Sequence, residues 1–267
     1  MNNKVRAPAA VPRAAATTLV VRDGAAGLEV LMLRRSDSAS FMPGAYVFPG
    51  GAVDASDATP AHEAACDQSA AELARRIGAV TEVGHQALAY AVAALRECFE
   101  ECGLWLGVES APTPGWAVLR QRLHAGESIA ALATAARVRL AVSALQPWSH
   151  WVTPVGLPKR FDTLFFVATA PPGQTPEVDA GETTTLAWVH PPQALAAQAE
   201  GAFQMEFATR STVQSLLPFA AGTGNALLAH AAALHHLPPL HPRLHLDHNG
   251  KRIGVLLPGQ PGYDETD

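Results

Sequence analysis

The chain has 267 residues, of which 48% are hydrophobic and 16% charged, and its formal net charge is -5. This length allows one substantial hydrophobic core, or one domain that carries a sizeable insertion. The acidic balance argues against a nucleic-acid-binding protein that relies on a basic surface. No apolar run reaches the roughly 18 to 20 residues that span a bilayer, so we expect no membrane partner.

The three cysteines make a poor disulfide framework. Cys98 and Cys102 are four positions apart in a predicted helix, where bridging geometry is unfavourable. The sequence ends at Asp267 without the Ser-Lys-Leu peroxisomal signal. We therefore expect a cytoplasmic protein with reduced thiols, and we interpret Cys98 as a core residue.

Strands and helices are predicted in an irregular order along the chain. Residues 1–16 are interpreted as a disordered tail, because prolines interrupt their apolar stretch. Strands are predicted at 17–22, 28–34, 46–48, 148–153, 161–169 and 183–189, the first two joined as a hairpin by Asp23-Gly24. Helices are predicted at 69–77, 86–102, 116–132, 191–199 and 209–221. Residues 17–237 form the predicted domain, and 238–267 an irregular tail with room for one strand at 253–257. The order has no βαβ rhythm and predicts an α+β or α/β/α layered domain.

The most informative segment is Arg-Glu-Cys-Phe-Glu-Glu-Cys-Gly-Leu, residues 96–104. On a helix, Glu97 and Glu101 share a face, and Glu100 lies beside Glu97. Like charges at this spacing repel each other, and the helix dipole disfavours negative charge in the last turns. A hard divalent cation such as Mg²⁺ or Mn²⁺ removes both conflicts, because it prefers carboxylate oxygens. The alternative is a solvated acidic helix end with no function.

This segment resembles the core of the Nudix box. In that pattern a glycine is followed by five residues, a glutamate, seven residues and then Arg-Glu-U-X-Glu-Glu-X-Gly-U, where U is aliphatic. The Phe-Pro-Gly-Gly of residues 48–51 is similar to the strand and loop that open the box, with Gly50 and Gly51 as its glycines. Asp57 then stands at the position of the first glutamate, and residues 58–95 stand where the family usually has seven residues.

The length of this split box points to one branch of the family. A box with a long insertion resembles the peroxisomal CoA diphosphatases of mammals and their bacterial relatives. Residues 44–51 and 148–166 also resemble that branch, with Ser40 where its CoA-type signature usually has arginine. We interpret residues 58–83 as a helical insertion that forms a lid, a dimer contact in a homodimer, or an inert flap.

The resemblance implies a Nudix fold, a mixed sheet between helices with the box as a loop, helix and loop. It implies that water attacks one phosphorus atom of a diphosphate. The implied metal ligands are Glu97, Glu100, Glu101 and the Gly51 carbonyl, with Mg²⁺ or Mn²⁺ as the cofactor. Arg96 would orient the carboxylates, and either Glu100 or Glu182 would accept the proton from water.

The resemblance also implies a small-molecule nucleotide substrate. CoA or an acyl-CoA is the leading candidate, and its cleavage would give 3′,5′-ADP and a 4′-phosphopantetheine product. ADP-ribose, a dinucleotide or a nucleotide sugar is the alternative within the family. An alternative of a different class is a Nudix-fold sensor that binds a nucleotide without cleaving it.

Two pairs of adjacent cations outside the box are candidate phosphate-binding groups. They are Arg34 with Arg35, and Lys159 with Arg160. The alternative for each pair is a basic surface without a ligand. Glu182 belongs to an acidic loop that could supply a base or a further metal ligand, and the alternative is a solvated loop.

Overall fold

The computed structural model describes residues 10–38, 42–109, 115–179 and 183–264. Its main sheet has the strand order β3-β2-β1-β6-β5, with β4 also paired to β1 and β7 to β2. The strands are β1 (Arg13–Gly24), β2 (Gly27–Arg35), β3 (Tyr46–Val47), β4 (Gly50–Ala52), β5 (Gln146–Val152), β6 (Phe161–Thr169) and β7 (Thr183–Val189). β1 and β6 are parallel, and the other pairs are antiparallel, so the sheet is mixed.

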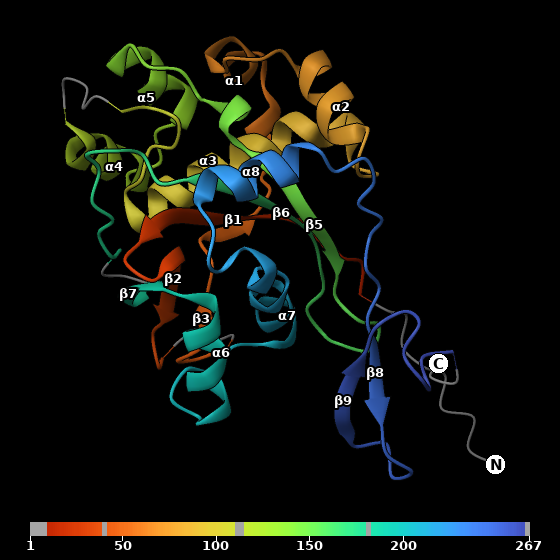
Figure 1. Ribbon diagram of the computed structural model, residues 1–267. Helices are drawn as coiled ribbons and strands as arrows, with labels where there is room; N and C mark the ends of the chain where they lie inside the picture. Colours follow the sequence, from red (N-terminus) through yellow and green to blue (C-terminus); the bar gives the residue numbers. More distant parts are fainter. Residues whose placement is uncertain (1–9, 39–41, 110–114, 180–182, 265–267) are drawn as a thin grey trace.

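Helices cover both faces of this sheet (Figure 1). One face carries η1 (Ala55–Ala58), α1 (Pro60–Ala65), α2 (Ala70–Gly78), η2 (Gly84–Gln86), α3 (Ala87–Cys102), α4 (Trp116–His124), α5 (Ile129–Ala136) and η3 (Val142–Ala144). The other carries α6 (Pro191–Ala199), α7 (Phe207–Ser215), η4 (Leu217–Phe219) and α8 (Gly224–Ala232). A second sheet pairs β8 (Arg243–Leu246) with β9 (Arg252–Leu256). The α+β prediction of a mixed sheet between helices is confirmed.

The two halves of the core follow from the alternation of side chains along the strands. In β6, Leu164 and Phe166 face α3, while Phe165 and Val167 face the α6–α8 layer. The Ala-rich first half of α3 is buried, because small side chains let the helix lie close to the sheet. This close packing places the C-terminal half of α3, with its carboxylates, against β1 and β4.

Several predicted boundaries were wrong. β1 begins at Arg13, so residues 13–16 of the predicted tail belong to the sheet. The helix predicted at 116–132 is two helices, because Gly126 adopts a positive φ of 91° and Ser128 then caps a new start. The helix predicted at 209–221 is α7 followed by η4, and α1 and α8 were not predicted. The tail predicted as irregular contains the β8–β9 hairpin, whose second strand begins one residue before the predicted 253.

The segment between Asp57 and α3 is helical, as predicted for the insertion, and it is fastened to the domain. Cys66 forms a parallel bridge with Leu140. The Arg76 guanidinium donates hydrogen bonds to the carbonyls of Leu145, at 2.5 Å, and Val142, at 2.7 Å. These contacts tie the segment to the rest of the domain, and its role as a lid, a dimer contact or an inert flap stays a prediction.

The three cysteines belong to the core of the domain. All three cysteines are free and buried, and Cys98 is fully enclosed in the core. Within the described ranges, none of the helices combines the length and apolar character needed to span a bilayer.

Candidate functional site

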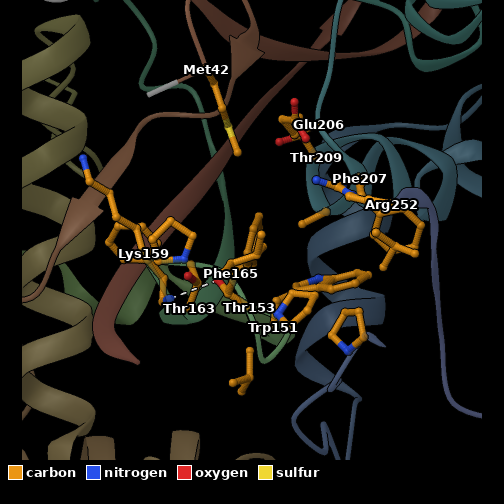
Figure 2. A pocket seen from close by; sticks show the side chains of 18 residues that line it. Met42, Trp151, Thr153, Lys159, Thr163, Phe165, Glu206, Phe207, Thr209 and Arg252 are labelled. Atoms are coloured by element: carbon orange, nitrogen blue, oxygen red, sulfur yellow. Dashed lines mark hydrogen bonds between the residues drawn. The ribbon is translucent and has the colours of Figure 1, made fainter. Parts of the chain in front are cut away.

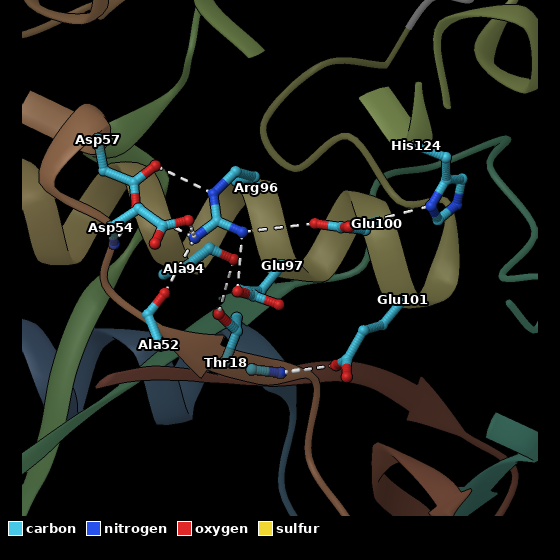
Figure 3. A network of polar contacts seen from close by, with 11 residues as sticks. Thr18, Ala52, Asp54, Asp57, Ala94, Arg96, Glu97, Glu100, Glu101 and His124 are labelled. Atoms are coloured by element: carbon cyan, nitrogen blue, oxygen red, sulfur yellow. Dashed lines mark hydrogen bonds and ion pairs between the residues drawn. The ribbon is translucent and has the colours of Figure 1, made fainter. Parts of the chain in front are cut away.

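The candidate site lies at the C-terminal end of α3, where Glu97 and Glu101 project towards the β1–β4 strand pair and Glu100 lies between Arg96 and His124 (Figure 3). The Thr18 hydroxyl of β1 donates a hydrogen bond to the Ala94 carbonyl at 3.3 Å, which ties α3 to the sheet. The helix ends at Gly103, whose φ of 71° suits glycine and whose N–H donates to the Phe99 carbonyl. The predicted helix of 86–102 and its stop at Gly103 are therefore confirmed to within one residue.

Arg96 is the centre of the polar network. Its Nε and Nη2 atoms donate to the two carboxylate oxygens of Asp57, each at 3.0 Å. Its Nη1 lies 2.8 Å from Glu97 Oε1 and 3.4 Å from Glu100 Oε2, and Nη2 also donates to the Ala52 carbonyl. The planar guanidinium thus holds the helix carboxylates and the box-opening loop in one arrangement. The orienting role of Arg96 in catalysis stays a prediction.

Asp57 is the buried anchor of this network, with an exposed fraction of 1%. It accepts both Arg96 bonds and a third, from the Asp54 backbone N–H at 2.8 Å. The short helix η1 brings the Asp57 backbone close to α3, so aspartate reaches the arginine despite having one methylene fewer than glutamate. The aspartate at this position of the box therefore makes a bidentate contact with Arg96.

Gly51 leaves room for Glu97. A Cβ atom at Gly51 would lie 2.5 Å from the Glu97 carboxylate, so any side chain there would displace it. Burial raises the pKa of Glu97, and the nearby Arg96 opposes that effect. A desolvated carboxylate beside a bare backbone is the kind of oxygen ligand that a hard divalent cation stabilises.

Glu101 is also largely buried, with 8% exposed, and it contacts the box-opening loop directly. Its Oε2 accepts a hydrogen bond from the Gly50 backbone N–H at 2.8 Å. The carbonyl of Glu101 accepts from the Asp179 N–H at 3.2 Å, which brings the acidic loop against the end of α3. Gly50 thus donates its N–H to the Glu101 carboxylate, and Gly51, which has no side chain, leaves room for the Glu97 carboxylate.

Glu100 is the most exposed of the three carboxylates, with 34% of its side chain accessible. His124 at the end of α4 lies beside it, with Nδ1 3.9 Å from Glu100 Oε1 and Nε2 4.0 Å from Asp179 Oδ1. The sequence does not predict His124 as a site residue, because only the packing of α4 against α3 brings it there. No local motif around residue 124 signals this position.

The donor set suits a metal ion, although the carboxylates have not converged on one point. Within the described ranges, no group of three or more His, Cys, Asp or Glu side chains is close enough to hold an ion. Glu97 and Glu100 instead flank the Arg96 guanidinium. The all-oxygen donors and the space at Gly51 still fit Mg²⁺ or Mn²⁺.

The four predicted phosphate-binding cations have different surroundings. Arg34 forms an ion pair with Asp37 at 2.7 Å and donates to the Thr184 hydroxyl at 3.4 Å. The Arg160 guanidinium donates to the carbonyls of Thr153 and Ala10. Phosphate contacts by Arg34, Arg35, Lys159 and Arg160 stay predictions. Glu182 and Ser40 lie outside the described residues.

Comparison with known proteins identifies the fold first. A Nudix hydrolase of known structure from Alicyclobacillus acidocaldarius superimposes with a TM-score of 0.64 at 28% identity, covering 82% of this chain and 96% of the other. The family model described as the NUDT19 Nudix domain matches residues 5–206. The chain belongs to this family, and the Nudix fold inferred from the box is confirmed.

Relatives in animals share part of this sequence. The chain is 29% identical over 227 residues to the acyl-coenzyme A diphosphatase NUDT19 of Gallus gallus, covering 64% of this chain and 56% of the relative. It is 29% identical over 209 residues to the Homo sapiens protein of the same name, covering 64% and 55%. A putative nudix hydrolase of Caenorhabditis elegans is 27% identical over 168 residues, covering 61% and 46%. The chain thus spans about half the length of the curated relatives it matches.

Proposed function

We propose that this protein is a metal-dependent diphosphatase that cleaves CoA or an acyl-CoA. The observation that carries the proposal is the placement of Glu101 on Gly50 and Glu97 beside Gly51, with Glu100 next to them on α3, in a chain of the NUDT19 Nudix domain family. The named substrate of the avian and human relatives supports CoA over other nucleotides.

The metal ligands in this proposal are Glu97, Glu100, Glu101 and the Gly51 carbonyl. A bound Mg²⁺ or Mn²⁺ supplies positive charge to the diphosphate oxygens and lowers the pKa of a coordinated water. Arg96 keeps the carboxylates oriented through its bonds to Asp57 and Glu97. Arg96 would keep its two bonds to the buried Asp57 if Glu97 and Glu100 held the ion.

The chain offers two candidates for the general base. Glu100 is supported by its exposure and by its neighbour His124, 3.9 Å away, which could relay the proton towards solvent. Glu182 is the other candidate, from the acidic loop that begins beside the end of α3. Glu100→Gln and Glu182→Gln distinguish them, because removal of the base lowers kcat by about 10²-fold or more and removes the rise of kcat with pH on the acidic limb of its profile.

The experiment that tests the proposal is product analysis with a panel of diphosphates. Purified protein is incubated with CoA, ADP-ribose, NADH and a nucleotide sugar, with Mg²⁺ or Mn²⁺ and with a chelator as control. Metal-dependent release of 3′,5′-ADP and 4′-phosphopantetheine from CoA is the expected result. Cleavage of ADP-ribose or NADH but not CoA would keep the chemistry and overturn the substrate. A folded protein that cleaves nothing and binds nucleotide would be the sensor.

A further inference from the structure

Two cavities of the fold differ in chemistry and in position. The larger, of about 570 Å³, is mainly apolar and lies on the face of the sheet opposite α3, where Phe165, Trp151 and Phe207 surround it (Figure 2). The smaller, of about 260 Å³, is mainly polar and lies on the α3 face. The diphosphatase chemistry described above uses neither cavity, and the polar one has side chains that define a class of ligand.

The floor of the polar cavity brings three elements together. Tyr90 comes from α3, His150 from β5 and Asp162 from β6. His150 pairs with Leu164, a residue of the core on the α3 side, and Asp162 is two residues before Leu164, so both side chains face α3. His150 Nε2 donates a hydrogen bond to Asp162 Oδ1.

Two buried polar groups on this floor lack a partner in the part of the chain that the structure describes. Tyr90 and His150 are each only 2% exposed. The Tyr90 hydroxyl makes no hydrogen bond with the described residues, and His150 Nδ1 is buried without one. Burial, together with the nearby Asp162 carboxylate, raises the pKa of Tyr90, so its hydroxyl stays a neutral donor and acceptor. Because buried polar groups are normally hydrogen-bonded, the floor has bonding capacity that a ligand in the cavity can use.

The mouth of the cavity is formed by two segments that are far apart in the sequence. Glu82 lies in the turn between α2 and η2, and His241 lies between α8 and β8; both are exposed. The second segment is fixed along β5, because the Leu240 N–H donates to the His150 carbonyl at 2.8 Å and the Val152 N–H donates to the Leu240 carbonyl at 2.9 Å. The family match ends at residue 206, so this side of the mouth lies beyond the matched domain.

The charges of the lining decide which ligand fits. Glu82 and Asp162 contribute carboxylates, and the described lining residues include no lysine or arginine. The Asp162 side chain is 36% exposed, and the Glu82 carboxylate has no ion pair or hydrogen bond with the described residues. This negative lining repels phosphate groups and attracts a cation. The carboxylates and imidazoles are too widely spaced to hold a metal ion within the described ranges, which favours an organic cation with spaced donors.

We propose that this cavity binds a small organic cation with N–H donors, such as an alkyl diammonium compound. The carboxylates of Glu82 and Asp162 supply the opposite charge, and the Tyr90 hydroxyl accepts one N–H bond. Tyr90 lies six residues before Arg96, about 9 Å along α3, so the ligand is separate from an anionic diphosphate at the helix end. The inference goes beyond the proposed function and does not depend on it.

The test is a calorimetric titration of the whole chain, in a chelator and at low salt, with three compounds of similar length. They are 1,4-diaminobutane, the neutral 1,4-butanediol and the anionic succinate. Wild-type protein should bind one molecule of the diamine and neither of the other two. Binding of the diol as tightly as the diamine, or no binding of the diamine, would overturn the cation site.

Four variants locate the bound diamine. Tyr90→Phe removes only a hydroxyl and should weaken binding about tenfold, the value of one hydrogen bond to a charged group. Glu82→Gln changes an exposed side chain and should weaken binding about threefold. Glu200→Gln, an exposed carboxylate at the end of α6, is the matched control and should bind as wild type. Glu101→Gln should also bind as wild type.

The same variants decide against the proposal in two ways. Binding that Glu101→Gln abolishes would place the diamine at the α3 carboxylates. Binding that neither Tyr90→Phe nor Glu82→Gln weakens, or that Glu200→Gln weakens as much as they do, would show attraction to the acidic surface in general. Thermal unfolding of each variant confirms that it is folded before the titrations are compared.

Discussion

Replacing Gly51 with alanine tests whether Glu97 needs the empty space beside Gly51. The change should lower activity and leave the stability of the fold nearly unchanged. The new Cβ would lie 2.5 Å from the Glu97 carboxylate, whereas ordinary contact begins at 3.4 Å. The carboxylate must therefore move by about 0.9 Å, a distance set by these two values. Misplacement of a catalytic group by about 1 Å costs about 10²-fold in rate, so we expect a comparable loss in kcat/KM.

The stability of the Gly51→Ala protein should change little. The displaced atoms are the far end of a flexible side chain, and alanine also restricts the unfolded chain, which stabilises by about 0.4–1 kcal/mol. We therefore expect a melting temperature within about 4 °C of wild type. Activity is measured as phosphate-containing product released per minute, and stability by thermal unfolding followed by circular dichroism.

Gly50→Ala is the matched control, because it should lower the stability of the fold, which Gly51→Ala should leave nearly unchanged. Its Cβ would meet the Ala16 carbonyl at 2.5 Å and the Thr17 Cα at 2.7 Å, and both belong to the backbone of β1. Strands β1 and β4 would have to separate, so we expect a loss of about 1–3 kcal/mol in the free energy of unfolding.

A compensating change tests the mechanism behind the Gly51→Ala result. Glu97→Asp withdraws the carboxylate by one methylene, so the double variant should lose less activity than the product of the two single losses. Full activity in Gly51→Ala, or a loss that merely follows its melting temperature, would refute the reasoning.

Three further predictions concern the buried groups. Asp57→Asn removes the charge that two Arg96 bonds require, and it should lower the free energy of unfolding in urea by about 1–3 kcal/mol; an unchanged value would contradict the anchoring role. Because the folded pKa of Glu97 is raised, its ionised form opposes folding above the unfolded value of about 4.3. In a chelator, Glu97→Gln should therefore be more stable than wild type at neutral pH, with a difference that disappears towards about pH 4; a difference independent of pH would be inconsistent with burial. Burial raises the pKa of Cys66 to about 12, so this thiol should react with an aromatic disulfide reagent only after unfolding, and rapid labelling of the native protein would contradict its burial.

Much of the site could be predicted because its signals are local. The Arg-Glu-Cys-Phe-Glu-Glu-Cys-Gly segment contains the helix, its charge conflict and its stop, so the sequence alone indicated α3 and its carboxylates. The strands β6 and β7 and the helix α6 were also predicted with the observed bounds, because each has a clear apolar pattern or a proline at its start. Local patterns of this kind need no knowledge of the rest of the fold.

Features that depend on tertiary packing could not be predicted in the same way. His124 reaches Glu100 only because α4 packs beside α3, and the Arg160 guanidinium donates to the carbonyl of Ala10, 150 residues away in the sequence. The β8–β9 hairpin did have a local signal, the Asn249-Gly250 pair, where Gly250 has a φ of 77°. Its short, half-exposed strands gave too weak an apolar alternation to support that turn.

The most direct test of the account is the metal dependence of CoA cleavage in Glu101→Gln. Glutamine keeps an oxygen that can accept the Gly50 hydrogen bond, so the variant should fold, while it removes one anionic metal ligand. Glu200→Gln, an exposed position at the end of α6, is the control for loss of one carboxylate. We predict that wild type and Glu200→Gln release 3′,5′-ADP in Mg²⁺ or Mn²⁺ and not in a chelator, and that Glu101→Gln is slower by at least about 10²-fold. Cleavage by Glu101→Gln at the wild-type rate, or cleavage that persists in a chelator, would contradict the assignment of the α3 carboxylates as the metal site.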